Sequence, residues 1–266
     1  MSANSSNAET TDSSVTLFAR AVGGVLGYSL WAMVAVFVVP AFLILGINQA
    51  LKITGVLPGG IVAMDTALAT LSLFAAQFIL GFGVLMLLPK LIQKMSWKNL
   101  AKLLGVFRWP RLSDIGLALL AFVAYFVSTA IVQALLIEFM PGYNVDEVQN
   151  VGFSTGIVGV ELILAGIALV ILAPVFEELI FRGYLFGSIR KYVPFWLTAL
   201  VVSVLFGLAH GQVNVGVDVF VLSIFMCTVR ERTGTVWPTI LMHMIKNGLA
   251  FYLLFVNPEL VQSLMG

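Results

Sequence analysis

Two histidines, two glutamates and an arginine interrupt stretches of this sequence that are otherwise apolar. The chain contains only two histidines, His210 and His243, and the adjacent Glu177 and Glu178 are followed by Arg182. At the centre of a membrane, each ionised group costs roughly 2.5 to 3.5 kcal/mol on insertion scales. Because that cost is tolerable only where the groups meet and satisfy one another, the pattern predicts a functional site.

Helical spacing assigns these side chains to faces. Adjacent helical residues point about 100° apart, so Glu177 and Glu178 face different directions. Glu178 and Arg182 are four residues apart and can form an ion pair along one face, which leaves Glu177 free to face the interior. In the last apolar segment, His243 and Asn247 share a face by the same spacing.

A carboxylate and a histidine around one water form a general-base arrangement. Glu177 and His210 are the candidates for this role, and Phe206 shares the face of His210 as a packing aromatic. His243 and Asn247 are donors that could stabilise the oxyanion of a tetrahedral intermediate. This arrangement predicts hydrolysis of an amide by an activated water, without a covalent intermediate.

The same residues also allow a zinc-dependent alternative. Glu177, His210 and His243 equal the ligand set of a catalytic zinc with one open position, and spacing does not choose between the two readings. A local metal motif such as His-Glu-x-x-His is absent. We therefore expect no cofactor, with zinc as the alternative.

Composition defines the class of protein. Of the 266 residues, 60% are hydrophobic and only 10% are charged, whereas soluble domains are nearer a quarter charged. A net charge of +1 with no concentrated basic patch argues against nucleic acid as a partner. The single cysteine, Cys227, excludes an internal disulfide. We predict an all-α, polytopic membrane protein.

The apolar runs predict seven membrane spans, at about 25–47, 66–88, 114–138, 157–175, 195–210, 214–230 and 236–256. A further amphipathic segment at 176–193 carries the glutamate pair. The prediction is therefore seven to eight helices around a polar catalytic cavity. The order of the parts is a disordered polar tail (1–21), N-terminal spans with a basic loop (22–156), the catalytic core (157–258) and a short C-terminal tail (259–266).

Basic residues predict the orientation. All of the 14 Lys and Arg except Lys52 and Lys246 fall on one side of the predicted bundle, which places the N-terminus inside. On that side Lys90, Lys94, Lys98 and Lys102 recur every four residues. This basic stripe is typical of a lipid-headgroup anchor, with a docking face for an acidic substrate segment as the alternative.

The three motifs together resemble a known family. Glu-Glu-x-x-x-Arg at 177–182, Phe-x-x-x-His at 206–210 and His-x-x-x-Asn at 243–247 are similar to those of the CAAX protease and bacteriocin-processing family, also called the Abi family or type II CAAX prenyl endopeptidases. The similarity covers about 160–258.

The resemblance implies an intramembrane protease with a conical cavity open to the membrane and cytosol. If the roles in the family apply to the matching residues here, Glu177 would polarise a water together with His210. His243 and Asn247 would stabilise the oxyanion. Glu178 and Arg182 would order the site. Partners would be the lipid bilayer and a membrane-associated protein or peptide substrate. Family labels call these enzymes metalloproteases, and some bacterial relatives are linked to bacteriocin maturation or self-immunity. A catalytically silent scaffold or immunity protein and a proton-coupled transporter are the alternatives.

Overall fold

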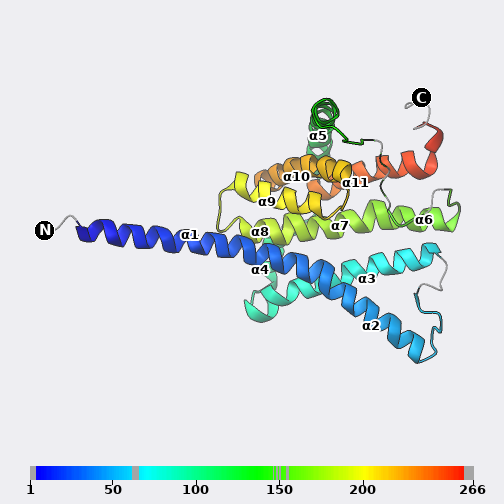
Figure 1. The fold of residues 1–266 in the computed structure, drawn as a ribbon, viewed down its shortest axis with the longest axis horizontal. Helices are drawn as coiled ribbons and strands as arrows, with labels where there is room; N and C mark the ends of the chain where they lie inside the picture. The colour runs from blue at the N-terminus through cyan, green and yellow to red at the C-terminus, as the bar shows by residue number, and fades with distance from the viewer. Residues whose placement is uncertain are drawn as a thin grey trace.

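The chain is seen in a computed structural model that describes residues 4–61, 66–145, 147, 149, 151–153 and 156–260. In these residues every regular element is helical (Figure 1), which confirms the predicted all-α, polytopic class. Six helices are long and apolar enough to cross a membrane: Ser14–Ile53, Leu68–Ile92, Leu112–Phe139, Val160–Ile189, Val213–Thr233 and Trp237–Val256. Residues 1–3 and 261–266, at the ends of the two predicted tails, lie outside the described residues.

Several long helices consist of α-helical and π-helical segments (η) in direct succession. The elements in chain order are α1 (Asn4–Met33), η1 (Val34–Val38), α2 (Val39–Ile53), α3 (Thr66–Leu87), η3 (Leu88–Ile92), α4 (Trp97–Leu104), α5 (Leu112–Phe139), α6 (Val160–Gly166), η4 (Ile167–Leu172), α7 (Ala173–Glu178), η5 (Leu179–Leu185), α8 (Phe186–Ile189), α9 (Phe195–Leu208), α10 (Val213–Thr233), α11 (Trp237–Phe251) and η6 (Tyr252–Val256). Figure 1 shows α5 almost end-on while α3, α7 and α10 lie across the view, so α5 crosses them steeply.

The first helix starts earlier than the sequence predicts. Helix α1 begins at Asn4, within the segment 1–21 for which the composition predicts disorder. Extending an existing helix adds one hydrogen bond for each residue that is fixed, whereas starting a new one is unfavourable. The apolar span from Ser14 onward provides the helix from which these polar residues continue.

The segment that carries the glutamate pair is one helix. The sequence predicts a span at 157–175 and a separate amphipathic segment at 176–193, but the structure has a single helical run at Val160–Ile189. Pro174 lies in the first turn of α7, directly after the π-helical η4, and does not break the run. A π-helical turn is a local change of hydrogen-bond register, which lets the helix continue past the proline.

The helix found at the predicted span 195–210 is too short to cross a membrane. Helix α9 has 14 residues, which at 1.5 Å per residue is about 21 Å, against roughly 30 Å of hydrocarbon. It instead forms a hairpin with α10, packed through two glycines. A Cβ on Gly207 would lie 2.8 Å from the Gly216 carbonyl oxygen. The turn that joins the two helices contains His210.

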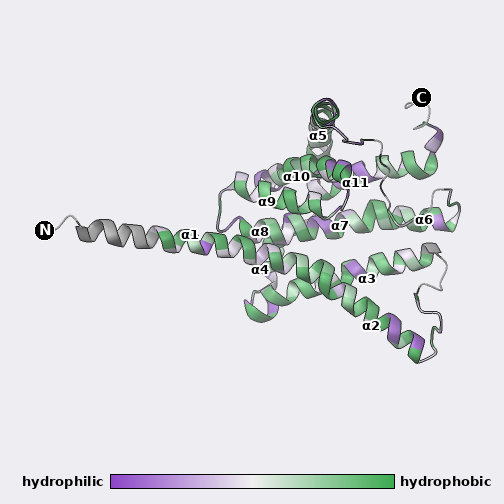
Figure 2. Cartoon of the chain, viewed as in Figure 1, coloured by the Kyte–Doolittle hydropathy of each residue, from purple (hydrophilic) through white to green (hydrophobic). Residues whose placement is uncertain are grey.

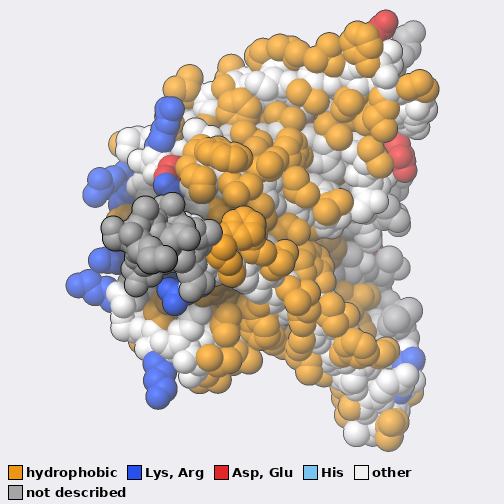
Figure 3. All heavy atoms as spheres, turned by 60° about the vertical axis from the view of Figure 1, so that its left-hand side comes forward, with side chains coloured by type: hydrophobic (Ala, Val, Ile, Leu, Met, Phe, Trp, Pro, Cys, Tyr) orange, Lys and Arg blue, Asp and Glu red, His pale blue; other side chains and the backbone are white. Residues whose placement is uncertain are grey.

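Hydrophilic residues form short interruptions in helices that are otherwise hydrophobic (Figure 2). Lys and Arg side chains gather toward one end of the face shown in Figure 3. At this end the amphipathic helix α4 packs on η5 and α8. A Cβ on Gly187 would lie 2.7 Å from the Leu103 carbonyl oxygen, and one on Gly183 would lie 3.1 Å from that of Leu104. The spacing Gly183-x-x-x-Gly187 thus permits close approach of α4.

Candidate active site

The glutamate pair lies in the middle of its helix. Glu177 is 17 residues after Val160 and 12 residues before Ile189, the bounds of the helical run. At 1.5 Å per residue it is about 18 Å from the end that carries the basic residues. The glutamates therefore lie near the middle of one continuous helical run and not at the start of a separate segment.

A fully buried ion pair occupies the centre of the bundle. Glu178 and Arg182 both have 0% exposure, and Arg182 Nη1 donates to Glu178 Oε1 at 2.8 Å. His243, on α11, places Nδ1 3.1 Å from the same carboxylate oxygen. The predicted pair along the helix is present, but Arg182 is an interior residue and not one of the loop residues that determine orientation.

The ring of Phe206 contacts the members of this cluster. The Arg182 guanidinium carbon lies 4.2 Å from the centre of the Phe206 ring, a cation–π contact. The rings of His210 and His243 meet Phe206 edge-on, at centroid distances of 4.9 and 5.8 Å. Phe206 therefore positions both histidines and covers the buried cation, a larger role than the packing aromatic that the sequence predicts.

A cavity of about 630 Å³ lies next to the buried pair. Four of the six predicted site residues line it: Glu177, His210, His243 and Asn247. Its other walls come from η1, α3, η4 and the segment around Gly152. Glu178 and Arg182 do not line the cavity, so the structure divides the predicted set into a cavity-facing group and a layer beneath it.

Each histidine is held through one ring nitrogen. His210 Nδ1 lies 2.8 Å from the Phe206 carbonyl oxygen, which can only accept, so Nδ1 carries the proton and Nε2 is unprotonated in the neutral ring. His243 is held in the same way by the Glu178 carboxylate at Nδ1. Its Nε2 lies 3.8 Å from Glu177 Oε2. The sequence pairs Glu177 with His210 alone, whereas the structure places His243 directly beside it.

The side chain of Asn247 replaces a backbone hydrogen-bond donor that is missing at Pro174. In η4 the Ala173 N–H donates to the Ala168 carbonyl, five residues back. The next bond of this register would run from residue 174 to Leu169, but proline has no N–H. Asn247 Nδ2 donates to the Leu169 carbonyl instead, at 2.9 Å. This bond fixes the amide in the cavity wall and leaves its second N–H hydrogen uncommitted to Leu169.

A second polar cluster adjoins the cavity and was only partly visible in the sequence. Asp218 Oδ1 accepts hydrogen bonds from Tyr125 at 2.7 Å and Thr129 at 2.9 Å. Its other oxygen lies 3.7 Å from the Lys246 ammonium, whose side chain lines the cavity. From the sequence alone Asp218 and Lys246 are at best residues that line a site, and nothing singles out the tyrosine and the threonine except their i,i+4 spacing on an apolar helix.

The zinc alternative requires Glu177, His210 and His243 to converge as ligands. Among the described residues no three His, Cys, Asp or Glu side chains are grouped so that they could hold a metal ion. His243 places Nδ1 against the Glu178 carboxylate and Nε2 3.8 Å from Glu177 Oε2, and a carboxylate at the second ring nitrogen is also usual for histidines that bind zinc. The choice between a metal-free site and a zinc site therefore stays a prediction.

Fold and site together define a multi-pass integral membrane protein with a cluster of ionisable and polar side chains in its interior. Residues 159–249 match the family described as Type II CAAX prenyl endopeptidase Rce1-like. The matched range contains all six predicted site residues and confirms, over this part of the chain, the resemblance based on the motifs.

A relative in Bacillus subtilis (strain 168), named "Putative membrane peptidase YdiL", is 29% identical over 77 residues. The alignment covers 29% of this chain and 32% of the relative, so the chain matches about a third of the length of that protein. No solved structure matches the chain.

Proposed function

We propose that the chain is an intramembrane endopeptidase that hydrolyses a peptide bond of a membrane-associated protein or peptide with an activated water. The observation that carries this proposal is the cavity in which Glu177, His210, His243 and Asn247 meet. The family match over 159–249 and the peptidase name of the relative support a protease.

In this proposal Glu177 is the general base. A water between Glu177 and the unprotonated Nε2 of His210 donates one hydrogen to each, which directs its oxygen toward a substrate carbonyl. Glu177 takes the proton as the oxygen attacks and later gives it to the departing amine. Its side chain is 21% exposed, so the carboxylate is open to the cavity and to water.

Negative charge then develops on the substrate carbonyl oxygen. The second N–H hydrogen of Asn247 and a proton on His243 Nε2 would stabilise this oxygen. Glu178 supports that role because its carboxylate lies 3.1 Å from Nδ1 of His243 and fixes the orientation of the ring, with Nε2 toward Glu177. Glu178 is thus a positioning residue, since it reaches the reacting atoms only through His243.

The test compares Glu177→Gln with the wild type, and uses Glu161→Gln as a matched control. Glu161 lies on the same helical run but does not line the cavity. Membranes from a host that expresses each variant are analysed for new protein termini by mass spectrometry. General-base loss lowers rates by roughly 10²- to 10⁴-fold, so we expect wild-type-dependent termini to disappear in Glu177→Gln and persist in Glu161→Gln.

Cleavage that survives in Glu177→Gln at the wild-type rate would overturn the assignment of the base. The same variant separates the protease from the alternatives. A scaffold or immunity protein would keep its phenotype when Glu177 is replaced, and a proton-coupled transporter would lose transport without any change in protein termini. Substrates retained by inactive Glu177→Gln in native membranes would identify what the enzyme cleaves.

A further inference from the structure

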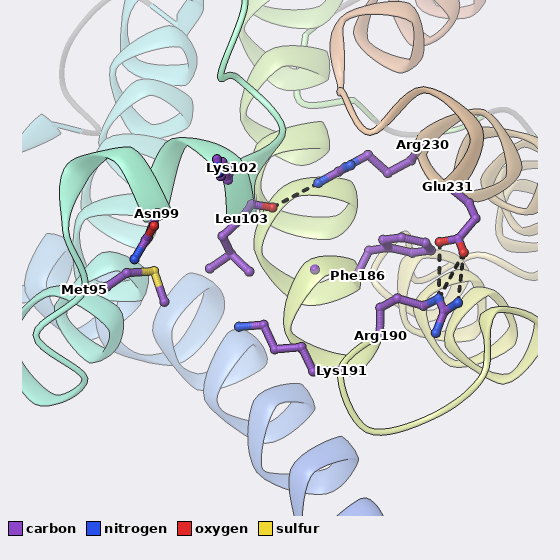
Figure 4. Close-up of a pocket in the computed structure, with 10 residues that line it drawn as sticks. Met95, Asn99, Lys102, Leu103, Phe186, Arg190, Lys191, Arg230 and Glu231 are labelled. Atoms are coloured by element: carbon purple, nitrogen blue, oxygen red, sulfur yellow. Dashed lines mark hydrogen bonds and ion pairs between the residues drawn. The ribbon is translucent and has the colours of Figure 1, made fainter.

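A second cavity, of about 530 Å³, lies at the basic end of the bundle, away from the catalytic residues. It is formed between α4, the end of α8 and the end of α10 (Figure 4). Its size is in the range of small-molecule sites. In Figure 4 the Lys191 side chain extends across the pocket toward Met95 and Asn99.

The pocket carries an excess of positive charge. Arg190 is neutralised by Glu231, with Nη2 and Oε1 2.9 Å apart. Arg230 donates to the backbone carbonyls of Arg182 and Leu103, both at 3.1 Å, and these oxygens carry no net charge. Lys102 and Lys191 form no ion pair among the described residues. Three cations therefore face one pocket without a carboxylate of their own, which favours an anionic ligand.

The rest of the lining is apolar. Leu103 and Phe186 are buried core residues that form part of the wall, together with Met95. Nearby, Trp97 is 73% exposed and has the Lys90 ammonium 3.9 Å from its ring centre, and Trp109 is 85% exposed. Exposed tryptophans beside basic residues are typical of the headgroup level of a bilayer. Cations above an apolar wall at this level suit an amphiphile better than a free ion.

We propose that this pocket binds the phosphate-bearing headgroup of an anionic phospholipid. Lys102 and Lys191 contact the phosphate, and the apolar wall takes the adjoining glycerol and acyl region. This is a discrete site between three elements, and it differs from general attraction of the Lys90–Lys102 stripe to a negative surface. It is independent of the proposed peptidase activity.

The pocket is also connected to the layer beneath the active site. Arg230 Nε binds the backbone carbonyl of Arg182, and the Arg182 side chain binds Glu178. Replacing Arg230 would therefore disturb the interior as well as the pocket. The two lysines are exposed and outside the catalytic machinery, so they are the appropriate positions for a test.

The experiment compares the double variant K102Q/K191Q with K94Q/K98Q in the purified full-length chain. Both variants remove two positive charges from the same end, but Lys94 and Lys98 do not line the pocket. Each protein is titrated in detergent with short-chain phosphatidylglycerol and, separately, with zwitterionic phosphatidylcholine. Bound lipid is counted by native mass spectrometry, and inorganic phosphate and an acidic peptide are added as competitors.

We expect phosphatidylglycerol to bind about tenfold more weakly to K102Q/K191Q, since each lysine near an anionic lipid contributes substantially to attraction. Binding to K94Q/K98Q should stay within about twofold of the wild type, and phosphatidylcholine should bind weakly to all three. Equal losses in the two double variants, or no preference for phosphatidylglycerol, would overturn the site. Displacement of the lipid by inorganic phosphate or the acidic peptide at equal concentration would overturn the assignment of the ligand.

Discussion

The cavity and the layer beneath it use similar side chains for different purposes. Glu177 is open to the cavity, whereas Glu178, its neighbour in sequence, has 0% exposure and is held by Arg182. His243 belongs to both regions because Nδ1 contacts Glu178 and Nε2 faces Glu177. The comparison separates side chains that satisfy one another inside the bundle from side chains that are open to the cavity, and only the open side chains are in a position to contact a substrate.

Replacing the buried glutamate should have the largest effect on stability. Glu178→Ala leaves the Arg182 charge buried without its partner, which costs about 3 to 5 kcal/mol. Glu177→Ala removes a partly exposed group with no hydrogen bond to the buried layer and should change stability by less than about 0.5 kcal/mol. Thermal unfolding of both variants in the same detergent measures the contrast. Equal shifts of the unfolding midpoint in the two variants would contradict the contrast between a buried, paired Glu178 and a cavity-facing Glu177.

A smaller effect is expected at Asn247, in the wall of the cavity. Asn247→Ala leaves the Leu169 carbonyl without a donor and should cost about 1 kcal/mol. In a Pro174→Ala background, the new backbone N–H can donate to Leu169, so the same replacement should cost almost nothing. A double-mutant cycle on unfolding free energies isolates this coupling. If the two replacements change the free energy of unfolding additively, the Asn247 side chain does not stand in for the backbone N–H that Pro174 lacks.

Metal removal should have the smallest effect. Because Glu177, His210 and His243 do not form a ligand set in the described part of the chain, incubation with a strong chelator should leave cleavage within about twofold of the untreated enzyme. The control restores zinc after chelation and removal of the chelator. Activity that falls on chelation and returns with zinc would show that these side chains rearrange around a metal.

The sequence predicted which polar side chains come together in the interior because buried polar groups in a membrane are rare and costly. The Glu178–Arg182 pair followed from helical spacing, and three motifs far apart in the chain pointed to one site. Span boundaries were less predictable. Hydropathy cannot distinguish a helix that crosses the membrane from a shorter one that forms a hairpin with its neighbour, as α9 does with α10. A proline that suggests the end of a helix is accommodated by the π-helical register of η4.

The sequence by itself determined the class of protein, the candidate residues and their division into helical faces, because these depend on composition and local periodicity. Only the tertiary structure decided that His243 lies beside Glu177, that Asn247 binds the carbonyl freed by Pro174, and that Phe206 contacts Arg182 and both histidines. These contacts join side chains from different helices. Their distances depend on how the helices cross and on close approach at small residues, which no local pattern specifies.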